Sequence, residues 1–180
     1  MQHAIIFLMD TTFTLKYEKP EVISAQRLRF IHSSRLLVTT LLGVLAVAYL
    51  CWQQFQIPAE ERSWITVIVV AAIFITMPVL VYFVAPGMDF KSNKGWRLEY
   101  RVNLRPGVMD FFRPGETKPV RFDLHKISKI MENSEVFILF FGKETNFIIL
   151  PKRIFRALGK EEWFVNDLKT LHISKWIIAK

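Results

Sequence analysis

The sequence predicts an α+β membrane protein, in which a two-helix transmembrane hairpin is followed by a strand-rich module closed by a C-terminal helix. Three observations predict this fold class: two long uncharged apolar runs, alternating apolar and polar residues after residue 95, and a mean hydropathy of +0.26 with 52% hydrophobic residues. Such a hydropathy is high for a soluble domain and low for a polytopic membrane protein. It excludes a wholly disordered chain, and the single cysteine, Cys51, excludes a disulfide scaffold.

The two apolar runs cover residues 36–55 and 64–85, which are 20 and 22 residues without a charge. Because an α-helix rises about 1.5 Å per residue, each run reaches about 30 Å, the thickness of the hydrocarbon core of a bilayer. The alternative, a pair of core helices in a soluble protein, fits poorly with such lengths of uncharged sequence. We therefore expect two membrane spans joined by an outer turn at residues 56–63.

Lysine and arginine are distributed very unevenly around this predicted hairpin. Five precede the first span and five closely follow the second, whereas the turn contains only Arg62. Because Lys and Arg are retained on the cytoplasmic side, we expect a multi-pass protein of the plasma (inner) membrane with both termini cytoplasmic. The first nine residues lack the basic start and the long apolar stretch of a signal peptide.

Pro78 falls inside the second predicted span. Proline removes one hydrogen bond of the helix and bends it. Two interpretations remain open: a functional hinge, or a tolerated kink of the kind that is common in membrane helices.

On both sides of the hairpin, the periodicity predicts smaller elements. Residues 1–35 are expected to form a cytoplasmic strand at 12–17 and an amphipathic helix from Pro20 into the first span. In the cytoplasmic domain 86–180, strands are predicted at 96–104, 108–113, 120–124, 136–141 and 147–150, with 125–131 ambiguous between strand and helical turn and a hairpin turn at 142–145. Pro151 and Gly159 frame a short helix, and Glu161 opens a second one with Lys169 and His172 near its end.

This order of parts, together with two short motifs, resembles the YcxB-like family of small two-span membrane proteins. The motifs are Asn146-Phe-Ile-Ile-Leu-Pro-Lys-Arg-Ile-Phe155 and Ile127-Ser-Lys-Ile130, the latter followed by Glu132 and Val136-Phe-Ile-Leu139. The resemblance implies that the C-terminal module is a domain of the bacterial PH-like type. It implies no particular activity.

Within the longer motif, Lys152 and Arg153 are candidates for contact with a partner or with phosphate groups, because they lie where a strand is expected to meet a helix. The alternative is a solvated turn in which Pro151 and Phe155 pack. Near the spans, a second candidate set could contact anionic lipid headgroups, or could serve only to mark the topology. It consists of Arg27, Arg29, Arg35, Lys91, Lys94 and Arg97.

The sequence offers no pattern typical of catalysis or of metal binding. His3, His32, His125 and His172 show no metal-ligand spacing, and a single cysteine cannot complete a zinc site. Neither a nucleophile elbow nor a glycine loop for phosphate is present. We therefore expect no metal, no cofactor and no enzymatic activity. The basic composition is largely explained by the bias around the spans, so we expect no nucleic-acid partner.

These observations leave three functional hypotheses. The first is a non-enzymatic membrane protein that anchors a small PH-like interaction domain at the inner membrane surface, as an accessory or scaffold subunit for another membrane protein or for further copies of itself. The second is a regulatory module that senses anionic membrane lipids. The third, a subunit of a membrane enzyme, would require a site assembled with another chain.

Overall fold

The computed structural model describes residues 10–142, 145–171, 173 and 175–179, and these form two compact units. The first, here called the strand domain, contains residues up to Ala25 together with those from Phe90 onward. The second, the hairpin unit, contains Gln26–Asp89. The strand domain is thus built from both sequence flanks of the hairpin unit. The division into 1–35, 36–85 and 86–180 that we expect from the sequence stays a prediction. The predictions for residues 1–9, for positions 143–144 of the hairpin turn and for His172 fall outside the described residues.

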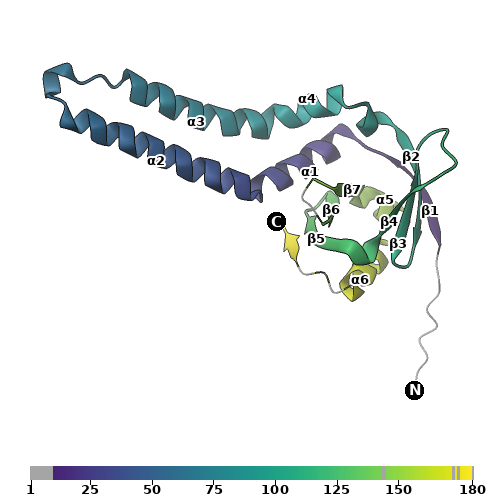
Figure 1. Ribbon diagram of the computed structural model, residues 1–180. Coiled ribbons are helices and arrows are strands. Elements are labelled where there is room, and N and C mark those ends of the chain that lie inside the picture. The colour runs from purple at the N-terminus through teal and green to yellow at the C-terminus, as the bar shows by residue number, and fades with distance from the viewer. Residues whose placement is uncertain (1–9, 143–144, 172, 174, 180) are drawn as a thin grey trace. The chain divides into compact units, whose positions relative to one another are not determined.

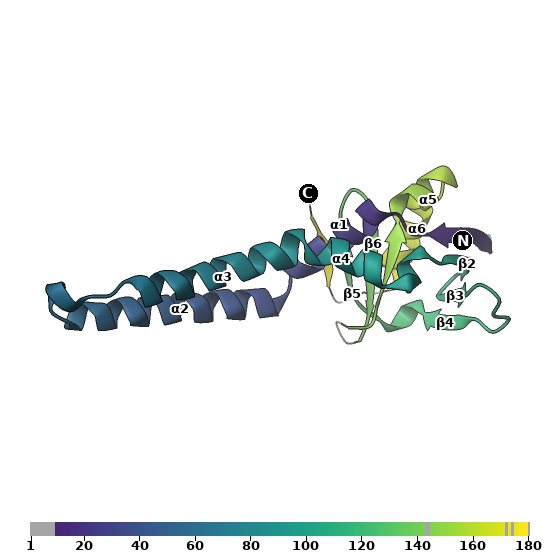
Figure 2. The same cartoon turned by 90° about the horizontal axis from the view of Figure 1, so that it is seen from above.

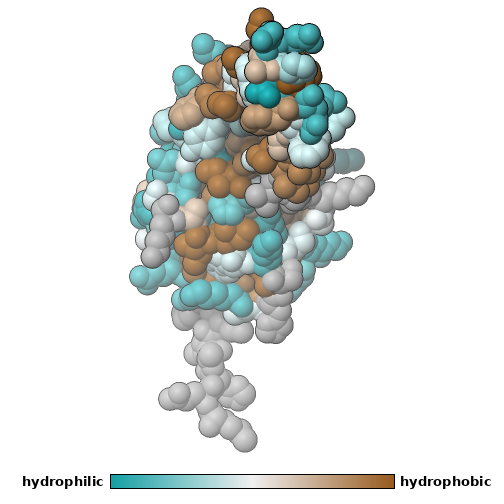
Figure 3. Space-filling model, turned by 90° about the vertical axis from the view of Figure 1, so that its left-hand side faces the viewer, coloured by the Kyte–Doolittle hydropathy of each residue, from teal (hydrophilic) through white to brown (hydrophobic). Residues whose placement is uncertain are grey.

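Two long apolar helices make up most of the hairpin unit and lie side by side (Figures 1 and 2). They are α2 (Ser34–Gln56) and α3 (Ile65–Phe83), and the turn between them contains a short 3-10 helix, η1 (Ala59–Glu61). Both helices are long and apolar enough to cross a membrane, and 6% of each candidate span is buried. Apolar side chains therefore remain on the molecular surface, where Figure 3 shows hydrophobic residues in brown. This confirms the prediction of two helices that could span a bilayer.

The two helices approach closely at Gly43. A Cβ atom at this position would lie 2.5 Å from Cδ1 of Phe74 on α3, so a larger residue here would force the helices apart. Pro78 lies one turn further along α3, which remains helical on both sides of it. Because proline has no N–H, the carbonyl of Phe74 loses its usual donor within the helix. Whether Pro78 acts as a hinge stays a prediction.

The end of α1 (Lys19–Ile31) contacts the end of α3 within the hairpin unit. Nε of Arg27 donates a hydrogen bond to the carbonyl of Tyr82 at 3.3 Å, and its guanidinium lies 5.1 Å from the centre of the Tyr82 ring. Nε2 of Gln26 donates to Oδ2 of Asp89, on α4 (Ala85–Ser92), at 2.5 Å. The last carbonyls of a helix lack partners within the helix, and a nearby cation is favourable there. Arg27 therefore stabilises the C-terminus of α3.

The strand domain contains two four-stranded sheets. The first has the order β1-β2-β3-β4 and is antiparallel throughout, and the second has the order β7-β6-β5-β8, with β8 parallel to β5. The strands are β1 (Thr11–Lys16), β2 (Glu99–Arg105), β3 (Val108–Phe112), β4 (Val120–Asp123), β5 (Ile127–Glu132), β6 (Val136–Phe141), β7 (Phe147–Pro151) and β8 (Trp176–Ile178). Two 3-10 helices, η2 (Lys94–Arg97) and η3 (Leu124–Lys126), precede β2 and β5. The ambiguous segment 125–131 is thus a helical turn followed by a strand.

Two short helices, α5 (Lys152–Ala157) and α6 (Glu161–Thr170), pack with the sheets around an aromatic core. The rings of Phe155 and Phe164 are stacked with their centres 4.4 Å apart, and Phe137 from β6 meets both of them edge-on. Phe13 from β1 lies 5.6 Å from Phe155. The N-terminal strand is therefore part of this core, which explains why the domain boundary lies after residue 25.

Candidate functional site

A cavity of about 250 Å³ opens in the strand domain, and we call it the aromatic cavity. Both sheets contribute to its lining: β2, β3 and β4 from the first and β7 from the second, together with η2 and the residue that follows β1. Six aromatic rings line it, those of Tyr17, Trp96, Tyr100, Phe111, Phe122 and Phe147, and the remaining lining residues are Asn93, Gly95, Arg113, Val120, Ile148 and Ile149.

Strand alternation brings these rings to one face of the first sheet. Successive side chains on a strand point to opposite faces, and Leu15, Val102 and Leu104 of β1 and β2 are fully buried on the inner face. Tyr100 shares their parity on β2, and Phe111 pairs with Val102 across the ladder. Five of the rings contact one another in a row, from Trp96 through Tyr17, Tyr100 and Phe111 to Phe122. All four contacts are edge to face, with ring centres 5.2–6.3 Å apart.

The tyrosine hydroxyls in this lining already have hydrogen-bond acceptors. The hydroxyl of Tyr17 donates to the carbonyl of Ile149 at 3.0 Å, and that of Tyr100 donates to the carbonyl of Gly95 at 2.9 Å. Burial raises the pKa of both phenols; for Tyr17, repulsion from Tyr100 and Glu21 adds to the shift, whereas for Tyr100 the nearby Arg113 partly opposes it. Both tyrosines are therefore neutral at physiological pH. Their hydroxyls connect neighbouring parts of the cavity wall through hydrogen bonds.

Arg113 carries the only formal charge among the described residues that line the cavity. Its Nη1 lies 3.7 Å from Oε1 of Glu116, and both side chains are about half exposed. An exposed pair at this distance contributes little, so the guanidinium can exchange this partner for another anion. The oxygen of Asn93 accepts a hydrogen bond from the amide of Gly95 at 3.0 Å and thereby fixes the η2 wall.

The lining of the cavity is mostly aromatic and aliphatic. The described residues around the cavity include no Ser, Cys, His, Asp or Glu, which are the usual nucleophiles and general bases. Elsewhere in the described parts of the chain, no three His, Cys, Asp or Glu side chains are grouped so that they could hold a metal ion.

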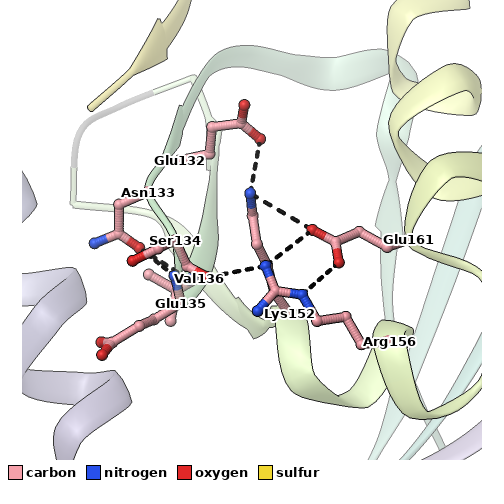
Figure 4. A network of polar contacts seen from close by, with 8 residues as sticks. All are labelled: Glu132, Asn133, Ser134, Glu135, Val136, Lys152, Arg156 and Glu161. Atoms are coloured by element: carbon pink, nitrogen blue, oxygen red, sulfur yellow. Dashed lines mark hydrogen bonds and ion pairs between the residues drawn. The ribbon is translucent and has the colours of Figure 1, made fainter. Parts of the chain in front are cut away.

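Lys152, one of the two sharpest candidates from the sequence, lies in an internal ion-pair network (Figure 4). Its side chain is 11% exposed, and its ammonium lies 3.5 Å from Oε2 of Glu132 and 3.7 Å from Oε1 of Glu161. The ammonium also lies 4.4 Å from the centre of the Phe137 ring. Arg156 completes the network, donating to Oε2 of Glu161 at 2.6 Å and to the carbonyl of Ser134 at 3.1 Å. Lys152 therefore stabilises the fold and has little surface to offer to phosphate.

Arg153 faces the N-terminal segment instead. Its Nε lies 2.5 Å from Oε1 of Glu21 and 3.2 Å from Oε1 of Glu18, and its Nη2 donates to the carbonyl of Lys16 at 2.7 Å. It thus connects α5 to the start of α1. The Arg153 side chain is 45% exposed, so a contact with a partner stays a prediction.

The six basic residues predicted near the membrane divide between the two units. Arg27 caps α3, as described above, and Arg29 also lies in the hairpin unit, with interactions of its own. The Arg35 side chain lies outside what the structure describes. The remaining three lie in the strand domain, between the end of α4 and the end of η2, and all three are exposed: Lys91, Lys94 and Arg97.

Asp110 on β3 carries the most buried carboxylate that the structure describes on the first sheet, and two arginines compensate its charge. Nε of Arg121 donates to Oδ1 at 2.8 Å, and Arg105 contacts Oδ2. The hydrogen bond from Arg121 lowers the pKa of Asp110, and Arg105 adds to the shift against the opposing effect of burial. Both guanidinium groups therefore form ion pairs with Asp110 within the first sheet.

We expect Asp110 to make the strand domain sensitive to acid. Its folded pKa lies below the unfolded value of about 3.9, so its stabilising effect is complete above that value and is lost as the pH falls through the folded pKa. In detergent, the free energy of unfolding should therefore fall less for Asp110→Asn than for the parent between about pH 5 and about pH 2. Equal losses in the two proteins would contradict this assignment.

The sequence analysis did not predict the aromatic cavity, although the alternation of apolar and polar residues indicates part of its lining. Alternation places Tyr100, Phe111 and Phe122 on inward-facing positions, but Tyr17 and Phe147 come from segments far from these strands in the chain. No family model, no curated protein and no solved structure matches this chain.

Proposed function

We propose that this chain is a two-span integral membrane protein that holds its strand domain at the cytoplasmic surface of the plasma membrane. In this role it is a non-enzymatic accessory or scaffold subunit, and the strand domain is the part that binds. The order of its elements resembles YcxB-like proteins, and two sheets with the helix α6 near the C-terminus, followed by the short strand β8, are compatible with the PH-like domain that this resemblance implies.

The observation that carries the proposal is the exposure of the apolar side chains on α2 and α3. On α3, Val67 is the only buried residue that the structure describes, while Ile65, Ile68 and Ile75 are each more than 60% exposed. A core helix of a soluble protein would be mostly buried, and monomeric soluble proteins rarely expose an apolar surface of this extent. Lipid would cover these faces, and the strong excess of Lys and Arg on the sequences flanking the spans supports a cytoplasmic strand domain.

The lack of catalytic groups in the aromatic cavity supports a binding role for the domain. The second hypothesis, sensing of anionic lipids, is favoured by one observation, the exposed Lys91, Lys94 and Arg97 on a single short segment. Each such cation near an anionic surface is worth about 1 kcal/mol.

Membrane extraction and cysteine labelling test the proposal together. Cys51 is the single native cysteine, so Cys51→Ser provides a background for one new cysteine at a time. In intact cells, an impermeant maleimide should label Ala59→Cys in the turn, and it should label Thr117→Cys in the exposed β3–β4 loop only after permeabilisation. The chain should stay in the membrane pellet after carbonate washing.

Two outcomes would contradict the proposal. Recovery of the chain in the carbonate supernatant would exclude membrane spans. Labelling of Thr117→Cys in intact cells would reverse the orientation and place the strand domain outside.

A further inference from the structure

We propose that the aromatic cavity binds one single-chain anionic amphiphile, a medium-chain fatty acid or the equivalent end of a membrane lipid. The hydrocarbon chain lies among the aromatic rings, and the acidic group faces Arg113. This inference gives the strand domain a ligand, and it does not depend on the hairpin unit crossing a membrane.

The volume limits the ligand to a small one. Pockets for drug-sized molecules span about 300–1,000 Å³, and this cavity, at about 250 Å³, lies just below that range. At about 30 Å³ per methylene, close to the volume of one water molecule in the liquid, the cavity holds about eight carbons. The cavity opens to the surface, so this volume limits the part of a ligand that it encloses, and the remainder stays outside.

The chemistry of the walls requires an apolar body. Ile148 and Ile149 of β7 belong to the lining, and they are 7% and 1% exposed. The hydroxyls of Tyr17 and Tyr100 donate to backbone carbonyls within the walls, so their protons are not available to a polar ligand. A sugar or a peptide backbone has more polar groups than Asn93 and Arg113 could pair with, and leaving the others without partners is unfavourable.

The charge at the cavity decides between a cationic and an anionic ligand. Several rings around a small cavity could form a cage for a quaternary ammonium group. Arg113 in the lining would repel such a cation, and the segment that supplies Trp96 also carries exposed Lys94 and Arg97. The described lining contains no carboxylate to balance them, and the partner of Arg113, Glu116, is held only loosely at 3.7 Å. The ligand therefore has an acidic end.

The test uses the full chain in nanodiscs of phosphatidylcholine and measures saturable binding of straight-chain carboxylates by calorimetry. Affinity should rise about fourfold for each added methylene up to octanoate or decanoate and should then level off when the cavity is full. Uptake by the bilayer would instead continue to rise beyond dodecanoate. Val120→Trp provides the blocked control: Val120 lies on the edge strand β4, lines the cavity and is 41% exposed, so a larger ring can enter the opening without displacing the core.

A second variant tests the charge. Arg113→Gln should weaken decanoate binding about fivefold to tenfold and leave the binding of decanol unchanged, because only the acid has a charge to lose. Lys118→Gln, an exposed residue of the same loop outside the lining, is the matched control and should bind both like the parent. This comparison remains decisive if Val120→Trp fails to fold.

The composition of the disc distinguishes the two sources of the ligand. Decanol, which the anionic surface does not repel, reports the occupant: if phosphatidylglycerol discs reduce its binding relative to phosphatidylcholine discs, the occupant is a membrane lipid chain, and equal binding assigns the cavity to a free acid. The proposal is overturned if the parent binds no more decanoate than folded Val120→Trp, or if Arg113→Gln changes decanoate and decanol binding equally.

Discussion

Replacing Lys152 with methionine should lower the free energy of unfolding of the strand domain by about 3 kcal/mol, because it breaks a buried ion pair from one side. The side chains of Lys152 and Glu132 are 11% and 12% exposed. Without the ammonium, the Glu132 carboxylate stays buried with no cation, since the described contacts give it no other salt bridge. Glu161 is affected less, because Arg156 remains beside it at 2.6 Å. Methionine has nearly the length of lysine, so it keeps the contact with the Phe137 ring but not the attraction between the ring and the cation.

A double substitution separates the charge from the packing. Adding Glu132→Leu to Lys152→Met removes the unpaired carboxylate and should restore most of the lost stability, because a well-packed apolar pair often replaces a buried ion pair without loss. Arg156→Met is the control: its side chain is 55% exposed, so removing it should cost about 1 kcal/mol or less. All four proteins can be compared by urea unfolding in a mild detergent, with hydrogen exchange of β6 as the readout. A loss for Lys152→Met no larger than that for Arg156→Met would show that the buried pair is not the source of the stability.

This network also shows why the sequence predicted a surface role for Lys152. The motif Pro151-Lys152-Arg153 does lie where a strand meets a helix, as the periodicity indicated. The acidic partners of Lys152, however, come from β5 and α6, and that of Arg153 comes from the start of α1, and no spacing along the chain connects them to positions 152 and 153. Whether a lysine is a solvated cation or half of a buried pair depends on this tertiary arrangement.

The elements themselves followed the sequence more closely. An uncharged run determines a long apolar helix locally, so α2 and α3 lie within two residues of the predicted spans. Alternation likewise predicted most strands, but it placed the start of β2 at Trp96. That residue belongs instead to η2, which is fixed by the Asn93 side chain at its start and by the hydroxyl of Tyr100 on Gly95.

Two features could not be predicted from local patterns. β8 has three residues and pairs with β5 in parallel, so it depends on a neighbour about 45 residues earlier in the chain rather than on a period of its own. The aromatic cavity depends on the register of β1 with β2 and on β7 lying opposite them. Periodicity indicates which face of a strand is apolar, but not which distant face it meets.

The second large effect is expected at Phe155. Phe155→Ala should lower the free energy of unfolding of the strand domain by about 3–5 kcal/mol, the range for removing a fully buried phenylalanine. The ring is 2% exposed, and it contacts Phe13, Phe137 and Phe164, which come from β1, β6 and α6. The cavity left behind would therefore weaken the packing of three elements at once.

The same substitution tests whether the N-terminal strand is an integral part of the domain. If β1 is held by this core, hydrogen-exchange protection of Phe13 and Leu15 should fall together with that of β6 in Phe155→Ala, because both share the stability of one cooperative unit. Leu158→Ala is the matched control, since Leu158 follows α5 directly and is 41% exposed, and it should change stability by about 0.5 kcal/mol or less. Loss of protection in β6 with unchanged protection in β1 would contradict a shared core. The flanks of the hairpin unit would then belong to separate units, and the strand domain would not include the sequence on both sides of the two apolar helices.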